Sequence, residues 1–498
     1  MKKNNFLNNQ LFRQKVLWLV LFIFMALTLW GGLNHAPWRD EAQAWLIVRD
    51  LGFVEIFQQM PYEGSPPLWH LLIAPLVKSG LPYESLIFFH IFLAWALVFI
   101  WLFFSPLPKI IKIILPFNYY FLFEYAIVAR NYSLSALLLF AIAALYQKRL
   151  KYSGAYSLLI FLLAWTNVFS LIPAALLSVG FIRDLIKERA TQSVKLKKIL
   201  NLAIMLSGII SAGLIMVPHV GQQYAGLNFL SGQITVWALA GALLPMAVAK
   251  LWVMSSPLLS WITAFSWLPL SWALIKNGVM RTAFYFSCAW LAFILMFKTM
   301  GDLRHYGLVL VFFLFFWWLS EAEGKDQKTD RPEENQILKT SSALPLALLI
   351  ILMTASAIYG GYFYLNNRNK NFSGAREMSL YLKDKGLDQE AIASYPSFIG
   401  TALLPYLPDK NFYQFETQRE GTFMTWDKDF VLGHMTPYII LKSRWKNYYI
   451  QNYPEYNSLL LLTMLPPGFD PELEFIGSNT RPTVKNDEFF YLYKLSIK

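Results

Sequence analysis

The chain has 498 residues, of which 56% are hydrophobic and only 15% are charged. Soluble proteins carry about 25% charged residues, so this composition excludes an ordinary soluble protein and favours a polytopic membrane protein. The net charge of +12 comes from Lys and Arg residues scattered between apolar segments, which fits a membrane-facing surface and not a nucleic-acid-binding face. The single cysteine, Cys288, excludes a disulfide within the chain and a cysteine metal site.

The N-terminal segment begins with Lys2 and Lys3 and continues into an apolar run from 16 to 33. This run is long, and no clear cleavage site with small residues follows it. We therefore expect a retained membrane anchor whose N-terminus lies in the cytoplasm.

Apolar segments recur along the first three quarters of the chain and predict about eleven to thirteen membrane-spanning helices. Two of them, 67–79 and 131–147, are short for a full span. Segment 154–183 is long enough for a tight pair broken near Asn167 or Pro173. The segments lie near 16–33, 67–79, 85–105, 108–126, 131–147, 154–183, 199–218, 233–250, 257–275, 281–299, 303–320 and 342–364.

The distribution of basic residues predicts the orientation of these helices. Lys and Arg gather at 148–151, at 183–198 and in the polar loop 321–341, which we therefore expect in the cytoplasm. The loop 34–66 then lies outside, and the apolar segment 342–364 carries the chain outward. The protein is expected in the inner (plasma) membrane as a multi-pass protein in contact with membrane lipids.

The stretch 366–498 has ordinary charge content and strand-like apolar runs, unlike the rest of the chain. A helix is expected from Ala375 to Lys385, stopped by Gly386. The predicted fold class is thus an α-helical polytopic membrane protein, with a membrane domain at 1–365 and a small extracytoplasmic α/β domain at 366–498. The expected strands cover 391–395, 438–441, 459–462 and 489–493.

An adjacent acid pair, Asp40 and Glu41, follows the first apolar segment and is flanked by Trp38 and Trp45. Carboxylates are costly near hydrocarbon and tend to mark function there. One of them could take the proton of an acceptor hydroxyl, and two neighbouring carboxylates raise each other's pKa. The alternative is that Asp40 caps a helix beginning at Glu41, and both roles can coexist.

Glu63 and His70 flank the Pro66-Pro67 pair, which fits the first turn of a helix. Both side chains could therefore face the same cavity as Asp40. The alternatives are a solvated loop charge for Glu63 and a hydrogen-bonded membrane histidine for His70.

Two arginines, Arg130 and Arg304, stand at the ends of apolar segments, where a charge is expensive without a partner. The planar guanidinium group suits phosphate oxygens. The alternatives are an ion pair with Glu124 or another acid for Arg130 and an interfacial anchor for Arg304. Their neighbours Tyr132 and His305 are further candidates for a substrate cavity.

The arrangement of lowest free energy gathers the charges of Asp40, Glu63, Arg130 and Arg304 in one outward-facing pocket, where opposite charges offset one another. We expect the Asp40 carboxylate and the Arg130 guanidinium within about 15 Å of each other, as one sugar phosphate would span.

Cofactor motifs are absent from the sequence, which contains no P-loop, dinucleotide fingerprint or HExxH. Asp40, Glu41 and His70 are residue types that bind metals, but their spacing does not demand a metal. No cofactor is expected with certainty, and a divalent metal ion stays an open alternative.

Three motifs together resemble a known superfamily: Trp-x-Asp-Glu-Ala at 38–42, Glu-Gly-x-Pro-Pro-Leu-Trp at 63–69 and Ala-Arg-x-Tyr at 129–132. With an N-terminal anchor, they resemble the GT-C superfamily of polytopic glycosyltransferases. The similarity is greatest to the bacterial group of protein O-mannosyltransferases and lipid A aminoarabinose transferases. It covers residues 1 to about 320 in architecture and is sharp only in the three motifs.

The resemblance implies roles for individual residues. Asp40 matches the acidic residue taken as catalytic base, and Glu41 matches its neighbour. Arg130 matches the arginine of the Ala-Arg-x-Tyr element, and Arg304 matches a basic residue at the start of a late span. Both arginines are then donor-phosphate ligands.

One position departs from the motif, because Ser65 stands where relatives often have a histidine, a function that His70 could supply. The resemblance implies transfer of a sugar from a polyprenyl-phosphate donor to a glycan, lipid or protein acceptor at the outer face, with inversion. The alternative is a transporter or flippase of lipid-linked glycans, which the lack of paired repeats disfavours.

Overall fold

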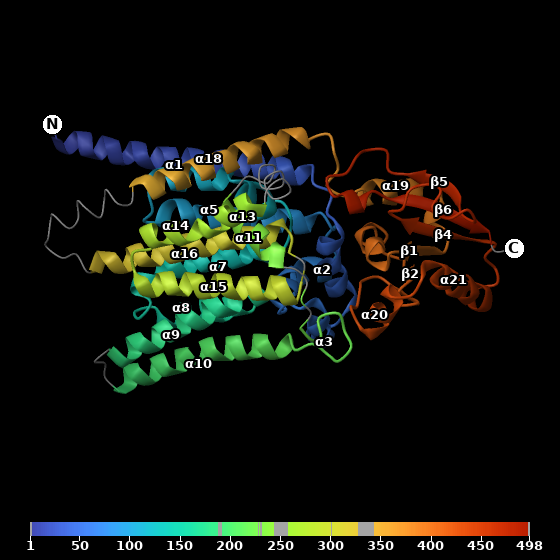
Figure 1. Cartoon of the computed structure of the whole chain (residues 1–498), viewed down its shortest axis with the longest axis horizontal. Coiled ribbons are helices and arrows are strands. Elements are labelled where there is room, and N and C mark those ends of the chain that lie inside the picture. The colour runs from blue at the N-terminus through green and yellow to red at the C-terminus, as the bar shows by residue number, and fades with distance from the viewer. Residues whose placement is uncertain are drawn as a thin grey trace.

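The computed structural model describes residues 2–187, 192–227, 229, 232–243, 257–299, 301–326 and 343–496. A bundle of long helices occupies one part of the molecule, and all the described strands lie in a C-terminal domain at one end of that bundle (Figure 1). The predicted fold class, a helical membrane protein with a small C-terminal α/β domain, is confirmed.

Seven helical segments among the described residues are long and apolar enough to cross a membrane, which makes the chain a multi-pass membrane protein. The expected number of eleven to thirteen spans stays a prediction, because parts of the chain lie outside the described residues. These parts include 327–342, and with them most of the predicted cytoplasmic loop 321–341. The seven segments lie in α1 (Lys2–Leu33), α5 (Ser85–Phe104), η4–α9 (Val168–Ser170 and Leu171–Lys187), α10 (Gln192–Ile215), α15 (Gly278–Phe297), α16 (Leu303–Asp326) and α18 (Ala343–Asn366).

Shorter helices fill the space between these spans. They are α4 (Leu68–Lys78), α7 (Asn131–Leu145), α8 (Ser153–Ala164), α11 (Gly232–Leu243), α13 (Pro257–Phe265) and α14 (Trp267–Leu274). The predicted break in segment 154–183 falls between α8 and η4, where the Asn167 side chain accepts the Ser170 N–H at 3.1 Å. The predicted segment 108–126 is not one continuous helix, because Asn118 accepts the N–H of Tyr120 at a turn. It divides into α6 (Lys109–Ile114), η1 (Leu115–Phe117) and a π-helical turn, η2 (Tyr120–Glu124).

Helix α16 is the central helix of the bundle, with contacts to α7, α11 and α15. Its residues are apolar on every side, and a helix of this kind is stable only where other helices surround it. Its membrane-spanning stretch is accordingly 94% buried. This position places Arg304, in the first turn of α16, at the end of the bundle that faces the C-terminal domain.

Two short helices, α2 (Arg39–Asp50) and α3 (Phe53–Glu63), lie at that same end of the bundle (Figure 1). The apolar stretch 42–48 of α2 packs against α4 and against the C-terminal domain. The expected cap at Asp40 is wrong, because α2 begins at Arg39. The carboxylate that accepts the N–H of Trp38, at 3.1 Å, belongs to Glu41.

The C-terminal domain contains a six-stranded sheet in the order β3-β2-β1-β4-β6-β5. Strand β1 pairs in parallel with β2 and β4, and the other pairs are antiparallel. The predicted helix is α19 (Ala375–Asp384), which Gly386 follows with a φ of +66°. The strands are β1 (Ile392–Tyr395), β2 (Phe412–Gln414), β3 (Arg419–Gly421), β4 (Ser458–Thr463), β5 (Glu474–Ser478) and β6 (Tyr491–Ser496).

Three of the four predicted strands correspond to β1, β4 and β6, the last beginning at Tyr491 instead of 489. The fourth, 438–441, is wrong, because it forms the first turn of α21 (Tyr438–Asn452). Leu441, Trp445 and Tyr449 recur at every fourth position and bury one helix face in the apolar cluster beside the sheet. A short helix, α20 (Lys428–His434), precedes α21.

Candidate active site

A cavity of about 540 Å³ lies between the end of the helix bundle and the C-terminal domain. It brings together every residue that the sequence proposed for the site except Glu41. These residues come from four separate segments of the chain and are Asp40, Glu63, His70, Arg130, Tyr132, Arg304 and His305.

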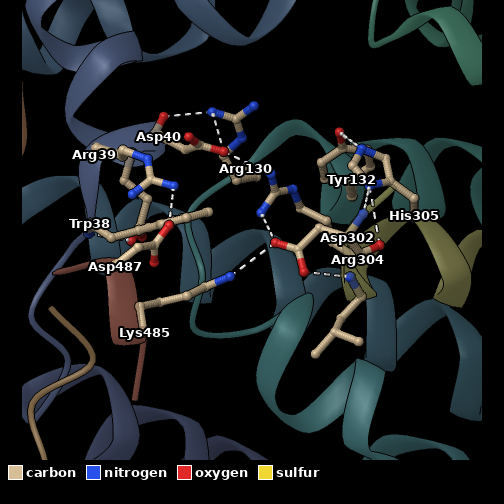
Figure 2. Close-up of polar contacts among 12 residues, drawn as sticks. Trp38, Arg39, Asp40, Arg130, Tyr132, Asp302, Arg304, His305, Lys485 and Asp487 are labelled. Carbon is tan, nitrogen blue, oxygen red and sulfur yellow. Dashed lines mark hydrogen bonds and ion pairs between the residues drawn. The ribbon is translucent and has the colours of Figure 1, made fainter. Parts of the chain in front are cut away.

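Asp40 lies in the first turn of α2, and its carboxylate points toward two arginines (Figure 2). Its Oδ2 is 2.7 Å from Arg304 Nη2 and 3.9 Å from Arg130 Nη1. The Asp40 side chain keeps 27% of its surface exposed, so it stays open to the cavity. The expected upper limit of about 15 Å between Asp40 and Arg130 is met with a wide margin.

The charges around Asp40 decide its protonation state. Burial alone would raise the pKa of Asp40, but Arg130 and Arg304, with Arg39 beside them, hold it below its ordinary value. The expectation that the neighbouring acid raises this pKa is therefore wrong. The carboxylate is ionised at neutral pH, as a proton acceptor must be.

Glu41 does not line the cavity, and its carboxylate is fully buried on the other side of the turn. It accepts the N–H of Ala129 at 2.7 Å and lies 2.9 Å from His35 Nε2. Burial opposes ionisation, but these contacts lower the pKa of Glu41 below its ordinary value. Glu41 therefore links the first turn of α2 to the backbone directly before Arg130 and lies outside the cavity that Asp40 lines.

Arg304 is shared between two acids. Its Nη1 is 3.0 Å from Asp302 Oδ2, while its Nη2 contacts Asp40, and its buried Nε has no partner among the described residues. Asp302 also accepts from Lys485 Nζ at 2.9 Å (Figure 2). Burial would raise the pKa of Asp302, but Arg304 and Lys485 hold it well below its ordinary value. The alternative of Arg304 as a simple interfacial anchor is wrong, because the side chain is buried and paired.

Tyr132 and His305 join α7 to the turn before α16. The Tyr132 hydroxyl is 2.8 Å from His305 Nε2, and His305 Nδ1 accepts the Asp302 N–H at 2.8 Å. These contacts fix the Asp302–Arg304 turn against the helix that begins directly after Arg130. Glu124 is not the partner of Arg130, because its carboxylate accepts from the Tyr119 hydroxyl at 2.8 Å. The other acid that this alternative allowed is Asp40, 3.9 Å from Arg130 Nη1.

Glu63 is part of a polar network and not a solvated charge. Its Oε1 accepts from Gln43 at 2.9 Å and from Gln59 at 3.2 Å. Both amides also donate to the carbonyl of Met424 in the C-terminal domain. Burial raises the pKa of Glu63 to about 7, against the smaller effect of the two glutamine hydrogen bonds. Glu63 is therefore poised between its two protonation states near neutral pH.

His70 is buried at the cavity wall, and its Nδ1 has no hydrogen-bond partner among the described residues. Ser65, at the position where the motif departs from its relatives, lines the same cavity. A buried polar atom without a partner is unfavourable. His70 Nδ1 is thus a buried polar atom at the cavity wall that lacks a hydrogen bond within the described part of the chain.

One side of the cavity is apolar and is built by the spans η4–α9, α10 and α15. Its residues are Val168, Phe169, Leu171, Gly213, Met216, Val217, Trp290, Phe293 and Ile294. The C-terminal domain closes the side opposite the spans with residues that sequence reasoning missed. These are Phe398 and Thr401 of η6 (Ser397–Ala402), together with Met424 and Trp426. The cavity therefore combines a charged end with an apolar wall.

Among the residues that the structure describes, no three His, Cys, Asp or Glu side chains gather closely enough to hold a metal ion. The metal-capable pair Asp40 and Glu41 points to opposite sides of its turn, so the two do not form a chelating pair.

The fold and the site define a class, a polytopic membrane protein with a charged cavity at one end of its helix bundle. Among solved structures, the chain is similar to ArnT from Cupriavidus metallidurans in the apo state. The TM-score is 0.52 at 11% sequence identity, over 96% of this chain and 97% of that chain. A structure of ArnT from the same organism bound to undecaprenyl phosphate gives a TM-score of 0.49 at 11% identity, over 98% of both chains.

No protein-family model matches the chain, and no curated protein matches it. At 11% identity the similarity to apo ArnT establishes the fold alone. It extends over the C-terminal domain, for which the motifs gave no signature. The resemblance that the three motifs predicted is confirmed at the level of the fold.

Proposed function

We propose that this protein is an inverting glycosyltransferase, which moves a sugar from a polyprenyl-phosphate donor to an acceptor hydroxyl at the outer face of the membrane. One observation carries the proposal: the Asp40 carboxylate lies 2.7 Å from Arg304 and 3.9 Å from Arg130 in one cavity with an apolar wall. A base and two phosphate-binding cations within the length of a sugar phosphate are the groups that such a transfer needs.

In the proposed reaction, an Asp40 oxygen takes the proton of the acceptor hydroxyl. The acceptor oxygen forms a bond to the anomeric carbon on the face opposite the phosphate. The bond between the anomeric carbon and the phosphate oxygen breaks, and the polyprenyl phosphate leaves with that electron pair. Arg130 and Arg304 stabilise the charge that develops on the phosphate, and fixed cations are most effective in a site shielded from water.

The ion pair between Arg304 and Asp40 suggests how the site would receive a donor. Arg304 lines the cavity and holds Asp302 through Nη1, so an arriving phosphate can compete with Asp40 for Nη2 without breaking the contact with Asp302. A phosphate with several charged oxygens competes well for a planar guanidinium group. Binding of the donor then draws Arg304 from Asp40 and frees the carboxylate to accept a proton.

The apolar wall suits the prenyl chain of the donor, since η4–α9, α10 and α15 are long and apolar enough to cross a bilayer. The acceptor would reach the cavity between the bundle and the C-terminal domain. A glycan, a lipid and a protein all offer the hydroxyl that the mechanism requires.

The test uses purified protein in detergent with a panel of undecaprenyl-phosphate monosaccharides and an extract of cell-envelope glycans, lipids and proteins as the source of acceptor hydroxyls. It measures the undecaprenyl phosphate released. We expect release with at least one donor, and a loss of about 100-fold or more in Asp40→Asn, since positioned bases contribute that much. Asp384→Asn, an exposed acid at the end of α19, is the matched control and should leave release unchanged.

Binding of undecaprenyl phosphate is measured beside release and should survive in Asp40→Asn. Donors that bind without being cleaved by the parent would overturn the transferase proposal and favour a transporter or flippase. Activity of Asp40→Asn within about tenfold of the parent would remove Asp40 as the base.

A further inference from the structure

The C-terminal domain reaches the candidate site through residues 485–488, which include the short helix η8 (Asn486–Glu488). Asp487 Oδ2 lies 2.5 Å from Arg39 Nη2, and Glu488 Oε1 accepts the backbone N–H of Arg39 at 3.2 Å. Lys485 Nζ lies 4.1 Å from the centre of a Trp38 ring. Two residues directly before Asp40 are thus held by one segment from the far end of the chain.

Lys485 also reaches the other side of the site. Its Nζ is 2.9 Å from Asp302 Oδ2, and Asp302 in turn binds Arg304, which binds Asp40 (Figure 2). The four groups form a row of alternating charge that ends at the proposed base. Lys485 holds Asp302, Asp302 holds Arg304 and Arg304 contacts Asp40, so the position of each group depends on the one before it.

The 485–488 segment is itself held firmly. The backbone N–H of Lys485 donates to Phe372 at 3.1 Å, and the buried Glu488 carboxylate accepts from Ser373. The N–H of Gly374 donates to the carbonyl of Glu488 at 2.9 Å. The segment is therefore anchored to the stretch that leaves α18, so Lys485 reaches Asp302 from a rigid support.

We propose that Lys485 is a positioning residue of the active site, which holds Asp302 so that Arg304 stays between Asp302 and the Asp40–phosphate centre. The inference rests on the proposed function and assigns the C-terminal domain a part in the site. Without the ammonium group, Asp302 would keep Arg304 as its one charged partner among these contacts. The guanidinium would then be drawn toward Asp302 and away from the place where Asp40 and the donor phosphate meet.

A role in packing alone would predict something different. Lys485 buries its side chain against Trp38 and Phe372, so a methionine of similar length would fill the same space. If packing were the whole role, Lys485→Met would match the parent. If the charge holds Asp302, Lys485→Met fails and Lys485→Arg, which keeps a cation, restores function.

The first experiment compares Lys485→Met, Lys485→Arg and the control Lys385→Met, which removes an exposed lysine from the same domain. Release of undecaprenyl phosphate from the donor found above gives kcat and KM over a range of pH. We expect Lys485→Met to lower kcat by about tenfold to 100-fold, because small misplacements of reacting groups have effects of this size. KM should change less, since Arg130 still binds the phosphate.

The pH profile separates positioning from a general loss of structure. The Lys485 charge helps to lower the pKa of Asp40, so its removal should move the acidic limb of kcat/KM to higher pH, and Lys485→Arg should move it back. Unchanged kcat and an unchanged acidic limb in Lys485→Met would overturn the proposal. The groups that face Asp40 and are held constant in this comparison are Arg39, Glu63, His70, Arg130, Asp302, Arg304 and His305.

A second experiment needs no substrate, so it separates failure of this inference from failure of the proposed function. Hydrogen exchange is measured at the amides of Glu41, Ala42 and His305, which are hydrogen-bonded within the two turns that Lys485 joins. Lys485→Met should exchange faster at both turns, while Lys385→Met should match the parent. Equal protection in Lys485→Met and the parent would overturn the inference even if the transferase reaction is established.

Discussion

Asp40 and Glu41 are neighbours in sequence with opposite surroundings. Consecutive residues of a helix point about 100° apart, so only one of two adjacent acids can face a given cavity. Asp40 faces the two arginines, and Glu41 is buried against Ala129 and His35. The pair therefore divides into the proposed proton acceptor, Asp40, and Glu41, which binds the backbone directly before Arg130. Residue identity alone does not reveal this division.

Arg130→Lys should weaken donor use although it keeps the charge. Arg130 Nη1 donates to the backbone carbonyl of Asp40 and lies near its carboxylate. A lysine ammonium group lacks the planar guanidinium that can hold two phosphate oxygens at once. A lost charge-assisted hydrogen bond is worth about 1.5–3 kcal/mol, so we expect kcat/KM for a polyprenyl-phosphate donor to fall about tenfold or more.

The matched control for Arg130→Lys is Arg419→Lys, which changes an exposed ion pair with Asp427 in the C-terminal domain. Both variants are compared by release of undecaprenyl phosphate over a range of donor concentrations. If they behaved alike, Arg130 would be a structural partner of Asp40 and not a phosphate ligand.

Glu63 should make the stability of the protein depend on pH. Its pKa rises from 4.5 to about 7 on folding, so the folded protein binds the proton more tightly than the unfolded chain does. The stability that this adds is present below about pH 4.5 and is lost as the pH rises to about 7. The change is at most about 3 kcal/mol.

Thermal unfolding in detergent at about pH 5 and about pH 8 tests this, with Glu63→Gln as the comparison. The substituted side chain stays neutral and keeps an acceptor for Gln43, so the variant should lose less stability than the parent as the pH rises. An equal loss in both proteins would mean that Glu63 is ionised throughout this range.

At the scale of helices and strands, the sequence predicted what depends on local pattern. Length and hydropathy located the spans, and the break at Asn167 followed from a polar residue inside an apolar run. The stretch 438–441 was misread because four apolar residues fit both a strand and the first turn of a helix. Only the apolar positions Trp445 and Tyr449, which continue the four-residue spacing from Leu441, distinguish the helix α21 from a strand.

Long-range contacts explain what the sequence could not predict in the site. A charge near the membrane signals a partner, which is why Asp40, Arg130 and Arg304 could be grouped. Lys485 lies in a polar stretch where a lysine is ordinary, and its partner Asp302 is 183 residues away in the chain. An acid two residues before Arg304 was a usable signal for Asp302, but nothing in the sequence pointed to Lys485.

At the scale of the whole molecule, contacts between the cavity and the C-terminal domain place the two on the same side of the membrane. Helices α1 and α18 both lead toward the end of the bundle that carries α2 and the C-terminal domain, while α9 ends and α10 begins at the opposite end (Figure 1). The ion pairs of Arg39 with Asp487 and of Asp302 with Lys485 tie the cavity to that domain. Wherever the C-terminal domain lies, the candidate site lies with it.

One labelling experiment therefore shows on which side of the membrane the C-terminal domain and the candidate site lie. In a Cys288→Ser background, Lys385→Cys places a thiol on an exposed face of the C-terminal domain, and Lys187→Cys places one at the basic end of α9. Basic loops favour the cytoplasmic side, so a maleimide that cannot cross membranes should label residue 385 in intact cells and residue 187 only after permeabilisation. The reverse pattern would put Asp40 and its cavity on the cytoplasmic side, where an outer-face acceptor could not reach them.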